Sequence, residues 1–170
     1  PTPAFLELVA AANPHQVTLV PDAPEQATSD HGWDFIAHKG LLTDVVAELA
    51  APGRRVALFC DPDASAAALE AAKAAGADRV ELYTGPYGAC YDNNEAAVSM
   101  LADLAETAHA AHALGLGINA GHDLTLANLP AFQSTVPFVD EVSIGHGITA
   151  DALIFGFEEA VRKYLGALGR

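Results

Sequence analysis

Two histidines each follow a glycine at the end of a short apolar run. Gly121–His122 ends the run in GLGINAGH, and Gly145–His146 ends the run in DEVSIGH. Imidazole is suited to proton transfer near neutral pH, and glycine lets backbone amides approach a ligand closely. The two pairs therefore indicate an acid–base group and a phosphate-binding turn. A loop-capping role for His122 and a simple tight turn at Gly145 are the alternatives.

Other polar residues stand in or beside apolar runs. Glu81 lies within VELYTG, where burial would raise the pKa of its carboxyl unless a cation or hydrogen bonds hold it ionised. A purely structural, hydrogen-bonded glutamate is the alternative. The stretch TSDHGWD, residues 28–34, is long and polar for a connection between a strand and a helix, which favours a functional role. Asp61 and Asp63, in contrast, are more typical of a turn that starts a helix.

These residues must be positioned by regular elements, and short apolar runs alternate with longer helical patterns along the chain. Strands rich in Val, Ile and Leu that alternate with helices predict a parallel sheet, at whose carboxyl edge ligands bind. An open doubly wound sheet and a (βα)8 barrel both fit this pattern. The chain opens on a helix with no strand before it, which favours the interpretation that it is part of a longer series of βα units. We expect strands at 15–21, 54–63, 78–85, 116–121 and 138–145, and helices at 1–14, 40–53, 64–76, 93–115, 124–132 and 149–169.

Composition limits the classes of function. The 170 residues, 51% hydrophobic and 18% charged, can form one sizeable core, so we expect a single domain over 1–170. A net charge of −14 disfavours nucleic acid and anionic membranes as partners. No apolar run is long enough to span a bilayer. Two cysteines without metal-ligand spacing, and no signal-peptide pattern, favour a reducing cytoplasm.

The order and spacing of several strings resemble a known family. TLVPD, QATSDHGWDF, VALFCDPD, GADRVELYTGPYG, GLGINAGHDLTLANL and VDEVSIGHGI follow one another as in the pyridoxine 5′-phosphate synthase family of vitamin B6 biosynthesis. The resemblance covers nearly the whole chain and implies a (βα)8 TIM barrel, of which the chain would carry about strands four to eight. It implies condensation of 1-deoxy-D-xylulose 5-phosphate with 3-amino-2-oxopropyl phosphate to pyridoxine 5′-phosphate, phosphate and water. It further implies a homo-oligomer that needs neither a metal nor an organic cofactor.

The resemblance also assigns roles to residues. It implies that His122 is the strand-seven proton donor and that Glu81 is the strand-six glutamate that stabilises charge during ring formation. Thr28 resembles the loop threonine that contacts deoxyxylulose phosphate, and Gly145 with His146 resembles the strand-eight phosphate-binding pair.

The sequence departs from the family in two respects. Asp123, beside the substrate, stands where many members have glycine. The family also begins with three further βα units, which carry a strand-one asparagine, a strand-two histidine and a strand-three glutamate that are not among these 170 residues. Two other functions therefore stay open: a metal-dependent aldolase or epimerase barrel that uses His122, His146 and Glu81 as ligands, and a non-catalytic phosphosugar-binding module.

Overall fold

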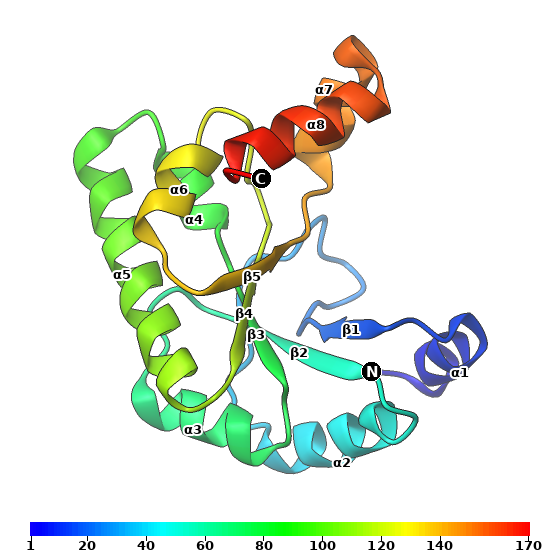
Figure 1. The fold of residues 1–170 in the computed structure, drawn as a ribbon. Coiled ribbons are helices and arrows are strands. Elements are labelled where there is room, and N and C mark those ends of the chain that lie inside the picture. Colours follow the sequence, from blue (N-terminus) through cyan, green and yellow to red (C-terminus); the bar gives the residue numbers. More distant parts are fainter.

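The computed structural model describes residues 1–170 and contains one five-stranded parallel sheet. The strands are arranged in sequence order, so each one is hydrogen-bonded to the next along the chain. Parallel neighbours need a crossover connection, and helical segments supply it (Figure 1). The predicted α/β fold with a parallel sheet is therefore confirmed. The strands are β1 (Gln16–Leu19), β2 (Arg55–Cys60), β3 (Arg79–Leu82), β4 (Gly117–Ala120) and β5 (Val139–Val142).

Eight helices accompany the sheet. α2, α3 and α5 cover its outer face, whereas α7 and α8 form a hairpin that projects from the carboxyl end of β5 (Figure 1). None of the helices combines the length and the apolar character that a membrane crossing requires. The helices are α1 (Pro3–Ala12), α2 (Lys39–Ala50), α3 (Ala66–Ala74), α4 (Gly85–Cys90), α5 (Asn94–Ala113), α6 (Leu129–Thr135), α7 (His146–Phe155) and α8 (Phe157–Ala167).

Polar side chains fix where three of these helices begin. Thr2, Ser65 and Asn93 each accept a hydrogen bond from the backbone N–H three residues further on, at the starts of α1, α3 and α5. This is the usual action of an N-cap residue, which satisfies a donor that the first turn leaves without a partner.

The two faces of the sheet carry different side chains, because successive residues of a strand point to opposite faces. The outer face is apolar and packs under the helices, whereas the inner face is polar. Residues with no exposed surface on the outer face include Val56, Leu58, Cys60, Val80, Leu82 and Ile118. Residues joined by polar contacts on the inner face include Gln16, Thr18, Arg79, Glu81, Asn119 and Glu141.

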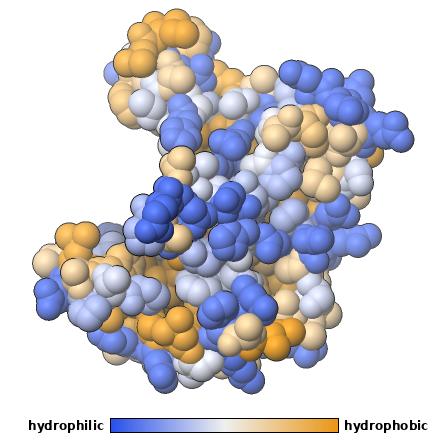
Figure 2. Space-filling view, turned by 180° about the vertical axis from the view of Figure 1, so that it is seen from behind, coloured by the Kyte–Doolittle hydropathy of each residue, from blue (hydrophilic) through white to orange (hydrophobic).

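The sheet is strongly curved, with the polar face on its concave side. Gln16 Nε2 donates a hydrogen bond of 3.1 Å to Glu141 Oε1, although β1 and β5 are the two edge strands. Arg55 of β2 also approaches Glu141, at 3.6 Å. Side chains of the first and last strands can meet only if the sheet bends around the space between them. Figure 2 shows the corresponding hollow between the α7–α8 hairpin and α1.

The end of the chain differs from the sequence prediction. We expected one helix over 149–169, but the structure has α7 and α8, separated at Gly156. Gly156 has φ of +81°, a value at which a right-handed helix cannot continue. The break lets α8 fold back on α7, and it leaves the apolar residues Leu153, Ile154 and Phe157 exposed at the tip.

Two further helices, α6 and α4, differ from the sequence prediction. The helix expected at 124–132 begins only at Leu129, because Asn128 Oδ1 accepts a 2.8 Å hydrogen bond from the Thr125 N–H and holds the preceding residues in a turn. The short helix α4, directly after β3, was not predicted from the sequence.

Candidate active site

His122 is the centre of a group of polar side chains at the carboxyl edge of the sheet. It lies two residues after the end of β4, and its Nε2 lies 2.8 Å from the Thr28 hydroxyl, which comes from the loop after β1. Its other ring nitrogen, Nδ1, lies 3.3 Å from Asp123 Oδ2 but is buried and makes no hydrogen bond. The Thr84 hydroxyl holds the backbone by donating to the His122 carbonyl. One ring nitrogen is therefore positioned by the protein, while the other is left without a hydrogen-bond partner.

Two aromatic rings flank the imidazole. The centroid of the Tyr83 ring lies 5.4 Å from that of His122 at an interplanar angle of 82°, and Phe59 lies 6.4 Å away. The sequence analysis did not single out either ring. Tyr83 could have been found, because it lies two residues after Glu81 and therefore faces the same side of the sheet.

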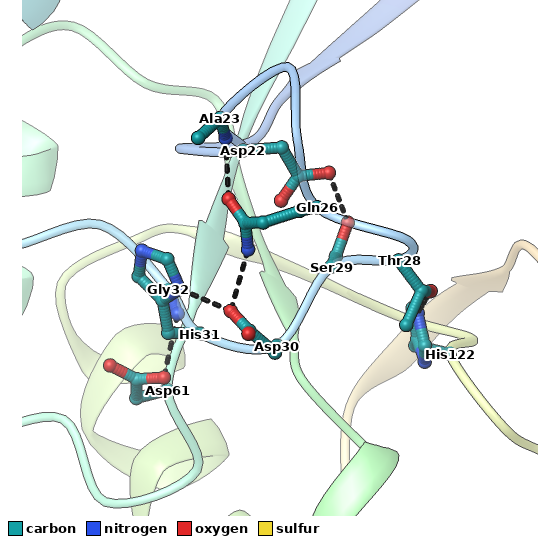
Figure 3. A network of polar contacts seen from close by, with 10 residues as sticks. All are labelled: Asp22, Ala23, Gln26, Thr28, Ser29, Asp30, His31, Gly32, Asp61 and His122. Carbon is teal, nitrogen blue, oxygen red and sulfur yellow. Dashed lines mark hydrogen bonds and ion pairs between the residues drawn. The ribbon is translucent and has the colours of Figure 1, made fainter.

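Thr28 is positioned by hydrogen bonds within its own loop (Figure 3). Ser29 Oγ donates to Asp22 Oδ2 at 2.7 Å, and Gln26 Nε2 donates to Asp30 Oδ1 at 2.7 Å. These short-range contacts hold the loop closed on itself, with Thr28 directed at His122. The functional role predicted for residues 28–34 stays a prediction, and the geometry shows that this loop places Thr28 beside His122.

Asp61 anchors the same loop to the sheet, in addition to leading into the predicted turn before α3. Its Oδ1 accepts a 2.6 Å hydrogen bond from the Gly32 N–H, and a side chain at position 32 would collide with the backbone of Asp61. Trp33 adds two further anchors, because its indole N–H donates to the Leu19 carbonyl and its backbone N–H donates to the Phe59 carbonyl. Contacts across 29 residues cannot be recognised from the local DPD pattern.

Glu81 lies on the concave face of β3 and is 9% exposed. Its Oε2 accepts a 2.9 Å hydrogen bond from the Thr18 hydroxyl of β1. Burial raises the pKa of the Glu81 carboxyl, the Thr18 hydrogen bond opposes this, and the nearby Glu141 carboxylate adds to it. Glu81 is thus both buried and hydrogen-bonded, and the pKa of its carboxyl lies above the ordinary value.

Gly145 and His146 form the start of α7. Gly145 is the N-cap residue, and a Cβ built on it would meet nothing within 4 Å. The His146 ring centroid lies 6.4 Å from that of His122, at an interplanar angle of 84°. The open space beside Gly145 and the free N–H groups of the first helical turn are suited to an anionic group.

Asp123 occupies a backbone conformation that favours glycine. Its φ is +62°, in the left-handed region, and Asn128 Nδ2 stabilises the segment by donating a 3.0 Å hydrogen bond to the Asp123 carbonyl. Aspartate is among the few other residues that tolerate this region. The geometry therefore accounts for an aspartate at a position whose backbone conformation glycine would adopt without strain.

Carboxylates dominate the charge around the site. The pKa of the Tyr83 hydroxyl is raised, mainly by burial and further by Asp123, Asp30 and Asp61. An anionic ligand must therefore be compensated locally, by imidazolium or by backbone N–H groups. The structure contains no group of three or more His, Cys, Asp or Glu side chains that could hold a metal ion.

The structure thus brings four of the six predicted site residues into one cluster: Thr28, His122, Asp123 and His146. Gly145 adjoins the cluster through His146. Glu81 lies on the same concave face and makes no direct hydrogen bond to His122.

A curved five-stranded parallel sheet with helices on its outer face and polar side chains at its carboxyl edge defines an α/β protein with a site where such sheets bind ligands. Comparison with solved structures agrees at the level of fold. The tryptophan synthase A-subunit of Pyrococcus furiosus matches 96% of this chain and 60% of its own, with a TM-score of 0.60 and 15% identity. A structure titled native KDPGal matches 100% of this chain and 68% of its own, with a TM-score of 0.55 and 14% identity. These TIM-barrel-like neighbours show the fold alone.

Sequence comparison then identifies the family. The family model described as pyridoxal phosphate biosynthesis protein PdxJ matches residues 1–170, and the chain belongs to this family. Proteins named pyridoxine 5′-phosphate synthase are similar throughout: that of Allorhizobium ampelinum is 63% identical over 169 residues, covering 99% of this chain and 68% of the relative. The relative from Chelativorans sp. is 60% identical over 167 residues, covering 98% and 67%. The predicted resemblance is confirmed.

Proposed function

We propose that the site at the carboxyl edge of the sheet serves the ring-forming reaction of pyridoxine 5′-phosphate synthase, the activity to which family and relatives assign this chain. The family match over all 170 residues carries this conclusion. It decides against both alternatives, the metal-dependent aldolase or epimerase and the non-catalytic binding module. The substrates are then 1-deoxy-D-xylulose 5-phosphate and 3-amino-2-oxopropyl phosphate, and ring closure requires several proton transfers.

His122 is the proton donor in this proposal. Its position at the centre of the polar cluster supports the role, as does the Thr28 hydroxyl 2.8 Å from Nε2, which fixes the ring orientation. Nδ1 is buried 3.3 Å from Asp123 Oδ2 and makes no hydrogen bond. Imidazole is the side chain best suited to proton transfer as a general acid.

Glu81 stabilises positive charge that develops in the condensing substrates. A buried carboxylate in a low-dielectric interior interacts more strongly with such charge than one in water. Burial raises the pKa of the Glu81 carboxyl, and an iminium intermediate beside it would favour the ionised form.

Gly145 and His146 bind a substrate phosphate at the amino end of α7, and Thr28 and Asp123 contact the deoxyxylulose phosphate. The open space at Gly145 supports the first assignment. Asp123 is exposed and negatively charged, so it is better placed to accept a hydrogen bond from a substrate hydroxyl than to meet a phosphate.

Residues 1–170 are in our proposal one domain segment, strands four to eight of a (βα)8 barrel. The contact between Gln16 and Glu141 supports the curvature that a barrel wall needs. The outer edges of β1 and β5 have no strand beside them, which suits strands that pair with further βα units. We also propose that the complete enzyme, meaning the whole natural protein that carries these residues, is a homo-oligomer with α5 as a contact surface. The molecular mass measured by light scattering at micromolar concentration should then exceed that of a monomer.

The function is tested by incubating the purified complete enzyme with both proposed substrates. We expect pyridoxine 5′-phosphate and inorganic phosphate to form in equal amounts. Chromatography measures the first product, and a phosphate assay measures the second. Phosphate release without formation of the pyridine ring would contradict the proposal, and so would ring formation that is abolished by removing divalent metal ions.

A further inference from the structure

Thr18 makes the one hydrogen bond that Glu81 receives from another side chain, and it does so across an intervening strand. Thr18 pairs in register with Ala57 of β2, and Ala57 pairs in turn with Arg79 of β3. The Thr18 hydroxyl nevertheless reaches Glu81 Oε2, at 2.9 Å. We attribute this contact between β1 and β3 to Ala57 on the intervening strand β2, which carries only a methyl group.

The other neighbours of Glu81 supply no such hydrogen bond. Phe59 and Asn119 are its register partners on β2 and β4. Phe59 is apolar. Asn119 accepts from Arg79 Nη1 at its Oδ1, at 2.7 Å, and its Nδ2 makes no hydrogen bond to any protein group, Glu81 included. The carboxylate of Glu81 therefore depends on Thr18 for its compensation within the protein.

The charged groups on the strands around Glu81 also influence the protonation of its carboxyl. Arg79 lies two residues before Glu81 on β3, and Arg55 lies at the amino end of β2. Both cations are directed toward Glu141 of β5, at 3.4 Å and 3.6 Å. β1 contributes no charged side chain to this face, and on β4 the nearest ionisable group is His122.

We propose that Thr18 is a positioning residue for Glu81, whose hydroxyl holds the buried carboxylate ionised and oriented across Ala57. This inference rests on the role proposed above for Glu81. A hydroxyl that donates to a carboxylate stabilises the charged form, and hydrogen bonds to charged groups are among the stronger ones in proteins.

Thr18→Val tests the proposal in the complete enzyme, because valine keeps the shape of threonine and removes only the hydroxyl. Thr18→Ser is the matched control that keeps the hydroxyl. Infrared difference spectra against Glu81→Gln report the protonated carboxyl of Glu81 directly as pH is varied. We expect Thr18→Val to keep Glu81 protonated to higher pH than the wild type, and Thr18→Ser to restore the wild-type titration.

Steady-state kinetics provide the second measurement. On the acidic side of the pH profile, kcat/KM of Thr18→Val should fall roughly tenfold relative to the wild type, with the loss shrinking as pH rises and Glu81 ionises. Thr18→Ser should follow the wild type. A loss in Thr18→Val that is the same at every pH would indicate a merely structural role and overturn the proposal.

The two measurements separate this inference from the proposed function. An unchanged Glu81 titration in Thr18→Val overturns the role of Thr18, even if Glu81→Gln is inactive. Full activity of Glu81→Gln overturns the role of Glu81 in the reaction, and the infrared titration still decides whether Thr18 controls its charge.

Discussion

At the scale of single residues, the site combines one imidazole at the carboxyl edge of the sheet with one buried carboxylate on its concave face. His122 is held by Thr28 at one nitrogen only, and Glu81 is held by Thr18 on the concave face. Each side chain is oriented by a threonine from the β1 end of the molecule. Proton transfer and charge stabilisation are thus assigned to different groups at different depths.

Replacing His122 by asparagine should lower turnover far more than it weakens binding. General acid–base groups contribute about 10²–10⁴-fold to rate, and the asparagine amide cannot serve as a general acid. Steady-state kinetics should show the loss in kcat, and calorimetry with a phosphate ester should show near-normal affinity. A near-normal kcat would rule out His122 as the proton donor.

Replacing Glu81 by glutamine should abolish most turnover but stabilise the fold near neutral pH. The folded state raises the pKa of Glu81 above its ordinary value, so it binds more protons than the unfolded state between the two pKa values. Stability is therefore lost as pH rises through that window. Glutamine does not ionise, so this loss of stability does not occur in the variant, and its amide oxygen can still accept a hydrogen bond from the Thr18 hydroxyl.

Thermal melts of the complete enzyme at acidic and neutral pH check this expectation. The difference in melting temperature between Glu81→Gln and the wild type should grow as pH increases. If the difference were independent of pH, the stability effect would not come from ionisation of Glu81.

At the scale of elements, the start of α7 offers two glycines with opposite surroundings. A Cβ at Gly145 would meet nothing within 4 Å, whereas one at Gly147 would come within 2.6 Å of the Leu124 carbonyl oxygen and 2.9 Å of the Tyr164 hydroxyl. The first glycine leaves space for a ligand, and the second allows close packing of the helix.

Gly145→Val should therefore raise KM for at least one phosphorylated substrate while changing the melting temperature little. Gly147→Val is the matched control, and it should lower stability by about 1–3 kcal/mol through overpacking. Steady-state kinetics and thermal melts of both variants in the complete enzyme test this pair. Unchanged KM values for both substrates in Gly145→Val would exclude a phosphate at this turn.

The sequence predicted the elements better than their ends. The apolar runs and the Gly–His pairs placed all five strands and the residues at their carboxyl edge. The break at Gly156 was missed because the apolar periodicity continues through it, and only its positive φ separates α7 from α8. The bond from Thr18 to Glu81 could not be predicted, since it depends on register across β2 and on a small side chain at Ala57.

At the scale of the whole molecule, the curved sheet has two unpaired edges. The edges of β1 and β5 present backbone N–H and C=O groups without a neighbouring strand. Such edges favour association with other chains. The apolar tip of the α7–α8 hairpin, with Leu153 86% exposed, adds to this tendency.

A chain limited to residues 1–170 should therefore not behave as a stable monomer. We expect a broad thermal transition and concentration-dependent association in calorimetry and light scattering, whereas the complete enzyme should melt cooperatively. A sharp two-state transition of the monomeric segment would contradict the assignment of its strands to part of a barrel.

The strict alternation of side chains along each strand has a consequence for how such a protein can change over time. Packing against the helices depends on one set of positions, and chemistry on the concave face depends on the set between them. A mutational library confined to the inward positions would explore new substrates while leaving the fold intact.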